Sequence, residues 1–263
     1  MKITALVENQ SNGRLKGVHG LSLYIETPRH KILFDVGPDN TLFDNSRAQG
    51  VDLSLVDTVI ISHGHYDHGG ALARLLEINS TAKIYVQKKA FLKHYVKISL
   101  IKKDIGLDGK LMNHPQLVLL DGDFEIDEEL KLFTVTGSPR CYSNANDTLY
   151  TDEGPDRFLH EQSLMILGSD NVLVMGCGHT GIVNIMEKAA QYRPEVCVGG
   201  YHLFNPTTGK TAPDEVLASI AVELSGYNIR YHTCHCTGKK AFSYLSERVA
   251  EMYYIACGDT IEV

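Results

Sequence analysis

The most constraining stretch of the sequence is Ser62-His-Gly-His-Tyr-Asp-His-Gly-Gly70, which follows the short apolar segment Asp57–Ile61. That segment predicts a strand buried on both faces, so the stretch comes at a strand end. Four possible metal ligands fall within six positions: His63, His65, Asp67 and His68. The glycines beside them allow the backbone to bend tightly. Imidazole and carboxylate groups together suit zinc, iron, manganese or a similar divalent ion. We therefore interpret the stretch as a metal-binding loop rather than a polar loop whose histidines bind nothing.

The spacing within this loop favours two ions over one. His63 and His65 stand two positions apart in extended chain, so their side chains project to the same side and can chelate one ion. Asp67 and His68 come where the chain turns into the next helix, so they point elsewhere and can serve a second ion. The loop therefore predicts part of a two-metal site.

Length and composition set limits on the domain organisation and the partners. A chain of 263 residues with 43% hydrophobic residues can bury a sizeable core, in one large α/β domain or in two tightly joined halves. With 25 basic and 32 acidic residues the formal net charge is −7, and a field of that sign repels polyanions. Nucleic acid is therefore not expected as the main partner, although local basic groups could hold a small phosphate.

The sequence also bears on the compartment. No apolar run is long enough to span a bilayer, so no membrane partner is expected. The N-terminal stretch Met1–Glu8 has neither the apolar centre nor the small-residue cleavage site of a signal peptide, and it predicts a first strand. We therefore expect a cytoplasmic protein. In a reducing compartment its six cysteines are free thiols, core residues or ligands rather than a disulfide framework.

Both halves of the sequence alternate strands with helices. In the first half, strands are predicted at Ile3–Val7, Leu21–Glu26, Lys31–Val36, Asp57–Ile61, Gln116–Leu120 and Leu130–Val135, and helices at Thr41–Gln49, Ala71–Ile78 and Lys88–Leu100. In the second half, strands are predicted at Ser163–Leu167, Asn171–Met175, Val196–Val198, Ile229–Tyr231 and Tyr253–Ala256, and helices at Ile182–Gln191, Asp214–Ser225 and Lys239–Val249. The polar stretch from Thr136 to His160 predicts a long surface loop, of the kind that is often functional. Two sheets packed face to face, with helices outside, would satisfy both halves.

A glycine motif, G-x-G-x-x-G, follows one of the later strands at Gly176, Gly178 and Gly181. In a dinucleotide-binding fold such a turn belongs to the first βα unit, and an acidic residue ends the next strand. Here the turn lies deep in the chain, and the next strand ends in Gly199 and Gly200. The dinucleotide interpretation therefore fails, and the cysteine and histidine within the turn favour a metal.

The segment His63-Gly-His65-Tyr-Asp67-His68 resembles the signature of the metallo-β-lactamase-fold superfamily. The resemblance implies a single α/β domain, residues 1–263, built as a four-layer αββα sandwich with one or two metal ions at its edge. It also implies that Asp35, after the third strand, steadies the metal loop. Further ligands should come from later strand ends, and the candidates are Cys177, His179 and His235.

The resemblance also guides the assignment of ligands. The histidine that the superfamily usually carries after the strand resembling Lys131–Val135 is missing, and His179 is the nearest replacement. We assign His63, His65 and His179 to one ion, and Asp67, His68 and His235 to the other. Cys177 either supplies a thiolate or only packs. The expected cofactors are two divalent metal ions, with zinc favoured and manganese, iron or magnesium as alternatives.

A closer resemblance extends over most of the chain. It depends on Val7–Asn9, His19–Ser22, Leu33–Gly37, Ser62–His65, Gly176–Cys177, His179–Asn184, Gly199–Leu203 and His235–Gly238. Together these segments are similar to the subgroup that contains the archaeal dihydropterin–ribofuranosylaminobenzene 5′-phosphate synthases of methanopterin biosynthesis. The resemblance implies transfer of a dihydropterin-methyl group to an arylamine, with release of pyrophosphate. The substrate would be a small molecule that bears phosphate.

Two other functions stay open at this point. A metal-dependent hydrolase of this fold would use a metal-bound hydroxide to attack an ester, a lactone or a phosphoester, and Asp67 would orient the water as well as bind metal. A non-catalytic metal-binding sensor is a second alternative. A transferase must exclude water, so lids are expected at Thr136–His160 and Leu100–His114. The oligomeric state, including a homo-oligomer, is also open.

Several other residues have a functional and a structural interpretation. Arg140, Lys239 and Lys240 are available for phosphates, helped by amides after His179 and Thr237, or they are solvated surface charges. His202 is either an acid–base or substrate-binding group or a hydrogen-bonded histidine beneath the site, and His19 is similarly ambiguous. Surface positions without a role are expected for His30, His94 and His114, and packing or supporting positions for Cys234 and Cys236.

Overall fold

The computed structural model describes residues 1–137 and 140–263, which divide into two compact units. The first unit comprises Met1–Lys93, Ile105–Asp121 and Ile255–Val263, and the second comprises His94–Asp104 and Gly122–Tyr254. Two positions of the predicted long loop, Ser138 and Pro139, lie outside the described residues. Within the described part of the chain, no helix is both long and apolar enough to cross a membrane.

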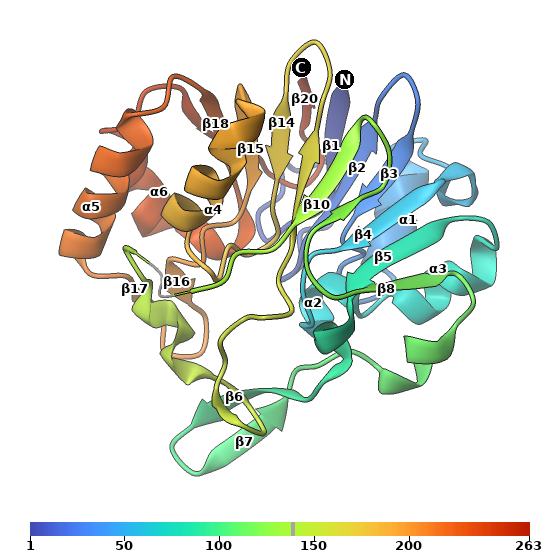
Figure 1. Cartoon of the computed structure of the whole chain (residues 1–263), viewed down its shortest axis with the longest axis horizontal. Coiled ribbons are helices and arrows are strands. Elements are labelled where there is room, and N and C mark those ends of the chain that lie inside the picture. Colours follow the sequence, from blue (N-terminus) through green and yellow to red (C-terminus); the bar gives the residue numbers. More distant parts are fainter. Residues whose placement is uncertain (138–139) are drawn as a thin grey trace. The chain divides into compact units, whose positions relative to one another are not determined.

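A seven-stranded sheet forms the framework of the first unit, in the order β20-β1-β2-β3-β4-β5-β8 (Figure 1). Its strands are β1 (Lys2–Val7), β2 (Ser22–Glu26), β3 (Lys31–Phe34), β4 (Thr58–Ile61), β5 (Lys83–Gln87), β8 (Leu117–Leu120) and β20 (Thr260–Glu262). The strands from β3 to β8 run parallel, whereas β1, β2 and β20 pair antiparallel. The strand β4 is buried at every position, as its largely apolar sequence predicts for the middle of a parallel sheet.

Three helices, α1 (Thr41–Ala48), α2 (Tyr66–Gly69) and α3 (Leu72–Ile78), complete the first unit, with 3-10 turns at Leu53–Leu55, Lys88–Phe91 and Gly109–Asn113. Leu42 of α1 and Leu72 and Leu75 of α3 join the strand residues Leu33 and Val59 in one buried core. The four-residue helix α2 directly follows β4, so the ligand-rich loop lies at the carboxyl end of a central parallel strand.

The second unit has its own seven-stranded sheet, in the order β19-β18-β15-β14-β13-β10-β9. Its strands are β9 (Phe124–Glu125), β10 (Leu130–Phe133), β13 (Ser163–Ile166), β14 (Val172–Val174), β15 (Val196–Gly199), β18 (Arg230–Thr233) and β19 (Met252–Tyr254). The strands from β14 to β19 are parallel, since each is followed by a helix or a turn that returns the chain. This is the βα rhythm that the sequence predicts.

The helices α4 (Ile182–Ala189), α5 (Asp214–Ser225) and α6 (Lys239–Ser246) belong to the second unit (Figure 1). Ile185 and Met186 of α4 and Leu217 of α5 pack in one buried core with the strand residues Leu173 and Tyr231. Shorter 3-10 turns lie at Asn144–Thr148, Ala190–Tyr192 and His235–Thr237. Because each unit has a core of its own, each can hold its loops in fixed positions.

The second unit also carries a four-stranded sheet, in the order β12-β11-β6-β7, and a small hairpin, β16–β17. The strands of these sheets are β6 (His94–Ile98), β7 (Ile101–Asp104), β11 (Leu149–Thr151), β12 (Gly154–Pro155), β16 (Phe204–Asn205) and β17 (Lys210–Thr211). The two-residue connection between β6 and β7, Ser99 and Leu100, is the tip of a hairpin whose Leu100 is fully in solvent.

Two sequence-based predictions are wrong here. The predicted helix Lys88–Leu100 is a 3-10 turn followed by strand β6, because Tyr95, Val96 and Ile98 pair with partner strands that no local pattern reveals. The predicted surface loop Thr136–His160 contains the strands β11 and β12, and it buries Asn146, Asp156 and His160. Its polar composition reflects buried polar contacts as much as exposure.

Candidate metal centre

The ligand-rich loop of the first unit is anchored by a buried carboxylate. Asp35, just past β3, accepts hydrogen bonds at 2.7 Å from both the backbone N–H and the hydroxyl of Ser62. The same carboxylate lies 2.6 Å from Nδ1 of His68, with both side chains fully buried. Asp35 adopts a φ of 60°, a conformation that Asp tolerates better than most residues. This arrangement orients the second nitrogen of His68 away from Asp35.

The other predicted ligands of the loop converge beside His68. The imidazoles of His63 and His65 approach to 3.0 Å between Nε2 and Nδ1, and the rings of His63 and His68 are 4.2 Å apart. Oδ2 of Asp67 lies 3.7 Å from Nε2 of His68 and 3.2 Å from Nε2 of His19. The structure therefore brings the four predicted ligands of this loop together, and it places His19 beside one of them.

The second unit gathers its own potential ligands at the carboxyl ends of three adjacent parallel strands. Cys177 follows β14, His202 follows β15 and His235 follows β18. Ligand atoms of Cys177, His235 and Cys236 lie within 4.8 Å of one another, as do those of Cys177, His179 and His202. Carboxyl ends of neighbouring parallel strands meet at one sheet edge, which explains why residues so distant in sequence converge.

Cys236, for which the sequence predicts a packing or supporting position, lies among the potential ligands of the second unit. Its sulfur lies 3.4 Å from the carbonyl oxygen of Cys177 and accepts the backbone N–H of His202 at 3.3 Å. Burial raises the pKa of this thiol, but its contacts with Cys177, His235 and His202 outweigh burial, so the pKa falls well below its ordinary value. A cysteine that ionises readily is a good ligand for zinc or iron. The only sequence signal was its position next to His235.

His179 is fixed from three sides. Its Nδ1 lies 2.8 Å from the side-chain oxygen of Asn146, and its backbone carbonyl accepts the amide of Asn146 at 3.0 Å. The ring of Phe158 stacks on the imidazole, with centroids 4.4 Å apart and planes 5° apart. The carboxylate of Glu161 accepts the backbone N–H groups of His179 and Thr180 at 2.7 and 2.8 Å. These partners leave Nε2 as the ring nitrogen directed away from Asn146.

The contacts of Glu161 also bear on the dinucleotide interpretation of the glycine motif Gly176–Gly181. The backbone N–H groups of His179 and Thr180, in the glycine turn just before α4, donate to Glu161, so two donors of this turn are already used. No sequence motif indicated this role for Glu161, because a single buried glutamate has no local signature.

His202 is buried in a strained backbone conformation with a φ of 43°. Its carbonyl oxygen accepts the hydroxyl of Ser143 at 2.6 Å, and its ring centroid is 4.1 Å from that of His179. Among the residues that the structure describes, none forms a hydrogen bond with Nδ1 of His202. Strain combined with an unsatisfied buried nitrogen is typical of a functional site.

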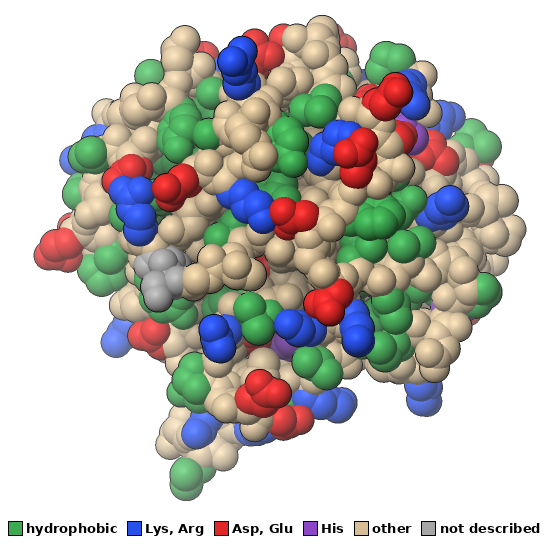
Figure 2. Space-filling model, in the orientation of Figure 1, with side chains coloured by type: hydrophobic (Ala, Val, Ile, Leu, Met, Phe, Trp, Pro, Cys, Tyr) green, Lys and Arg blue, Asp and Glu red, His purple; other side chains and the backbone are tan. Residues whose placement is uncertain are grey.

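A cavity of about 830 Å³ in the second unit is lined in part by His179 and Phe158. Two of its cations are already paired: Arg140 with Glu223 and Glu187, and Lys188 with Asp123. Figure 2 likewise shows Lys and Arg side chains next to Asp and Glu side chains on one face of the described residues. Arg157 also lines the cavity, is exposed, and forms no ion pair with a described residue.

Among the other positions that the sequence singled out, three are as expected and one is not. Lys239 and Lys240 are exposed, and Lys240 lies 3.8 Å from Asp214, which agrees with solvated surface charges. Cys234 is buried, as expected for a packing residue. The prediction for His94 is wrong: the residue is 1% exposed, because it begins the strand β6 and faces Asp156 at 3.0 Å.

Comparisons with known proteins agree with this geometry. The chain matches the model of the metallo-beta-lactamase superfamily over residues 15–182. A 7,8-dihydropterin-6-methyl-4-(beta-D-ribofuranosyl)-aminobenzene-5'-phosphate synthase of Methanocaldococcus jannaschii is 28% identical, over 95% of this chain and 92% of that protein. An uncharacterized protein of the same organism is 29% identical, over 93% and 94% of the two chains. A crystal structure of a metal-dependent hydrolase of the beta-lactamase superfamily is 24% identical, with a TM-score of 0.82 over 100% of this chain and 99% of that one.

The chain therefore belongs to the metallo-beta-lactamase superfamily, and the predicted fold class is confirmed. Members of this family bind metal ions, and the donor atoms of this chain suit them. The first unit offers imidazoles and a carboxylate, and the second offers imidazoles and two sulfurs, one with a lowered pKa. Such donors match zinc or iron better than magnesium, which prefers oxygen ligands alone.

Proposed function

We propose that this protein transfers a dihydropterin-methyl group from its diphosphate to an arylamine that carries a ribosyl phosphate. The proposal is supported by similarity to the named synthase over nearly the whole chain. The observation that carries it is the cavity beside His179, whose volume of about 830 Å³ suits a substrate of this size. Its lining combines the aromatic rings of Phe158 and Tyr142 with the guanidinium of Arg157.

In the proposed centre, the ligands are those assigned from the family resemblance, with Cys236 added. His63, His65 and His179 would hold one ion, and Asp67, His68 and His235 would hold the other. Cys177 and Cys236 are the sulfur donors nearest to His235. When bound, divalent metal ions supply positive charge that offsets the charge developing on a departing diphosphate.

The side chains of this chain account for the rest of the reaction. The amine nitrogen forms a bond to the methylene carbon, the carbon–oxygen bond to the diphosphate breaks, and the nitrogen loses a proton. We assign His202 as the acceptor of that proton, because its buried Nδ1 has no other partner among the described residues. Arg157 binds the phosphate, since the other cations of the cavity are neutralised by carboxylates. The aromatic rings hold the pterin and exclude water.

The test is an assay of pyrophosphate release with zinc- or manganese-loaded protein. Release that requires both the pterin diphosphate and the arylamine supports the transferase. Turnover of phosphoesters or lactones with water alone, and no arylamine-dependent release, would replace it with the hydrolase alternative. Loss of general base catalysis lowers kcat by about 10²- to 10⁴-fold, so His202→Gln should fall in this range with its metal content retained. His114→Gln is the matched control and should keep full activity.

A further inference from the structure

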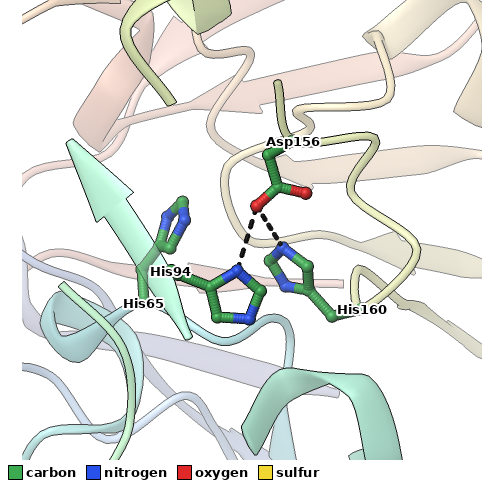
Figure 3. Close-up of side chains that lie close together, drawn as sticks. All are labelled: His65, His94, Asp156 and His160. Carbon is green, nitrogen blue, oxygen red and sulfur yellow. Dashed lines mark hydrogen bonds and ion pairs between the residues drawn. The ribbon is translucent and has the colours of Figure 1, made fainter. Parts of the chain in front are cut away.

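Three further potential ligands lie in the second unit, and none of the three is assigned to the proposed centre. Figure 3 shows the side chains of His94, Asp156 and His160 directed toward one another. Oδ2 of Asp156 lies 3.0 Å from Nδ1 of His94 and 3.2 Å from Nε2 of His160. The two imidazole centroids are 4.0 Å apart. All three residues are buried, at 1, 8 and 2% exposure in chain order.

The spacing of these atoms fits a shared metal ion. Two ligands held about 2.0 to 2.1 Å from a tetrahedral zinc ion are about 3.3 Å apart. The nitrogen-to-oxygen distances of 3.0 and 3.2 Å are close to that separation, and the ligand atoms lie within 4.8 Å of one another. A binding ion would therefore need only a small outward shift of the three side chains.

The surroundings hold the three side chains in place. His94 pairs with Thr151 across the β6–β11 ladder, and the backbone N–H of Asp156 donates to Leu149 at 3.0 Å. The second carboxylate oxygen of Asp156 accepts the N–H of Phe158 at 2.7 Å. Hydrogen bonding of a carboxylate through the oxygen that does not face the ion is a common feature of metal sites, where it orients the ligand.

Phe158 contacts one histidine of this group and one histidine of the proposed centre. The ring of Phe158 stacks on His179 at 4.4 Å between centroids, and it lies 6.0 Å from the ring of His160. One aromatic side chain thus contacts both histidines. Asp156 also lines the cavity, so an ion held there would have access to solutes.

We propose that His94, Asp156 and His160 form an additional binding site for a divalent transition-metal ion, zinc or iron(II). Two imidazoles and one carboxylate are a recurrent ligand set for both ions, and they leave coordination positions open for water or a small oxygen ligand. A buried carboxylate is stabilised when a cation binds it inside the protein. The site does not depend on the transfer reaction.

The decisive experiment is zinc loading of the full chain. Protein dialysed against micromolar zinc should hold one zinc ion per chain more than Asp156→Asn, which keeps the shape of the side chain but is a weak ligand. Asp152→Asn, an exposed aspartate on the neighbouring turn, is the matched control and should keep the full content. Equal zinc content in the wild type and Asp156→Asn would overturn the proposal.

Two further measurements keep the test independent of how the variants fold. Anomalous diffraction at the zinc edge from wild-type crystals should give a peak about 2.0 to 2.2 Å from the three named atoms, and a map without that peak overturns the proposal. In cobalt-substituted protein, Asp156→Asn should lose ligand-field absorption while the thiolate-to-cobalt charge-transfer band from the cysteine group persists. Unchanged ligand-field absorption in Asp156→Asn would count against the site.

Discussion

Oδ2 of Asp35 lies 2.6 Å from Nδ1 of His68, and neither side chain has any exposed surface. A carboxylate in this position fixes the tautomer of the imidazole, so that Nε2 is available to a metal ion. The same carboxylate binds Ser62, which carries the start of the ligand-rich loop. One buried acid thus organises both ends of the loop.

The first prediction concerns this acid. Replacing Asp35 by Asn keeps the size of the side chain and tolerates its φ of 60°, but removes the charge that orients His68. We expect metal affinity to fall by about 10- to 100-fold, the usual effect of losing such a supporting carboxylate. Competition with a chelator measures the affinity. Asp44→Asn, at an exposed site on α1, is the control, and equal affinities in the two variants would contradict the prediction.

Much of the fold, and the loop that gathers His63, His65 and Asp67, could be predicted because their signals are local. The largely apolar strand β4 and the histidines directly after it lie within a dozen consecutive residues. Likewise, the helix Asp214–Ser225 begins and ends where its acidic first turn and following glycine predict. Each of these features depends on neighbours a few positions away, so sequence patterns carry them.

The features that were missed depend on contacts between distant residues. His94 faces Asp156 across 62 positions, and the strand β6 that presents it exists only because β11 and β7 pair with it. Local periodicity therefore suggested a helix and a surface histidine. The sequence predicts a packing or supporting position for Cys236. Its lowered pKa comes from Cys177, from its neighbour His235 and from His202, and no local pattern reveals the approach of Cys177 and His202 from other strand ends.

A second prediction tests how His179 is held. Glu161 accepts two backbone N–H groups and the hydroxyl of Thr180, so Glu161→Gln turns an amide NH₂ toward these donors. An unsatisfied buried donor costs about 1 to 3 kcal/mol, and the free energy of unfolding should fall by that amount. Urea denaturation of the protein, after a chelator has removed bound metal, measures the free energy of unfolding. Glu153→Gln, at an exposed position, should be neutral, and a neutral Glu161→Gln would show that the carboxylate does not anchor the turn.

A third prediction concerns the close approach of two strand ends at Gly200. A Cβ atom at this position would lie 2.5 Å from the sulfur of Cys236 and 3.0 Å from the carbonyl oxygen of Gly176. Gly200→Ala should therefore lower the free energy of unfolding by about 1 to 3 kcal/mol, as overpacking generally does, and displace the thiol. Thiol reactivity toward a disulfide reagent in the metal-free protein reports the displacement.

The control for Gly200→Ala is Gly168→Ala, whose added Cβ would have as its nearest contact the carbonyl oxygen of Asp170 at 3.8 Å. This is an ordinary van der Waals distance, so the variant should match the wild type in both measurements. If Gly200→Ala is as stable as Gly168→Ala and its cysteines react at the same rate, then the strand ends are looser than the structure indicates.

The last prediction is a dependence of stability on pH that originates at Asp123. Burial opposes ionisation of this carboxyl, but Lys188 and the backbone N–H of Thr134 outweigh burial and lower its pKa. Because the pKa is lower in the folded state, the ionised group contributes stability at neutral pH, and that contribution is lost as the pH falls below about 4, the ordinary value.

The side chain of Asp123 is about half exposed, at 52%, so solvent screening limits the effect. Asp123→Asn should therefore lower the free energy of unfolding by about 0.5 to 1 kcal/mol at pH 7 and change it little near pH 2. Urea denaturation at the two pH values measures the difference, and the same deficit at both would mean that the side chain acts through shape rather than charge.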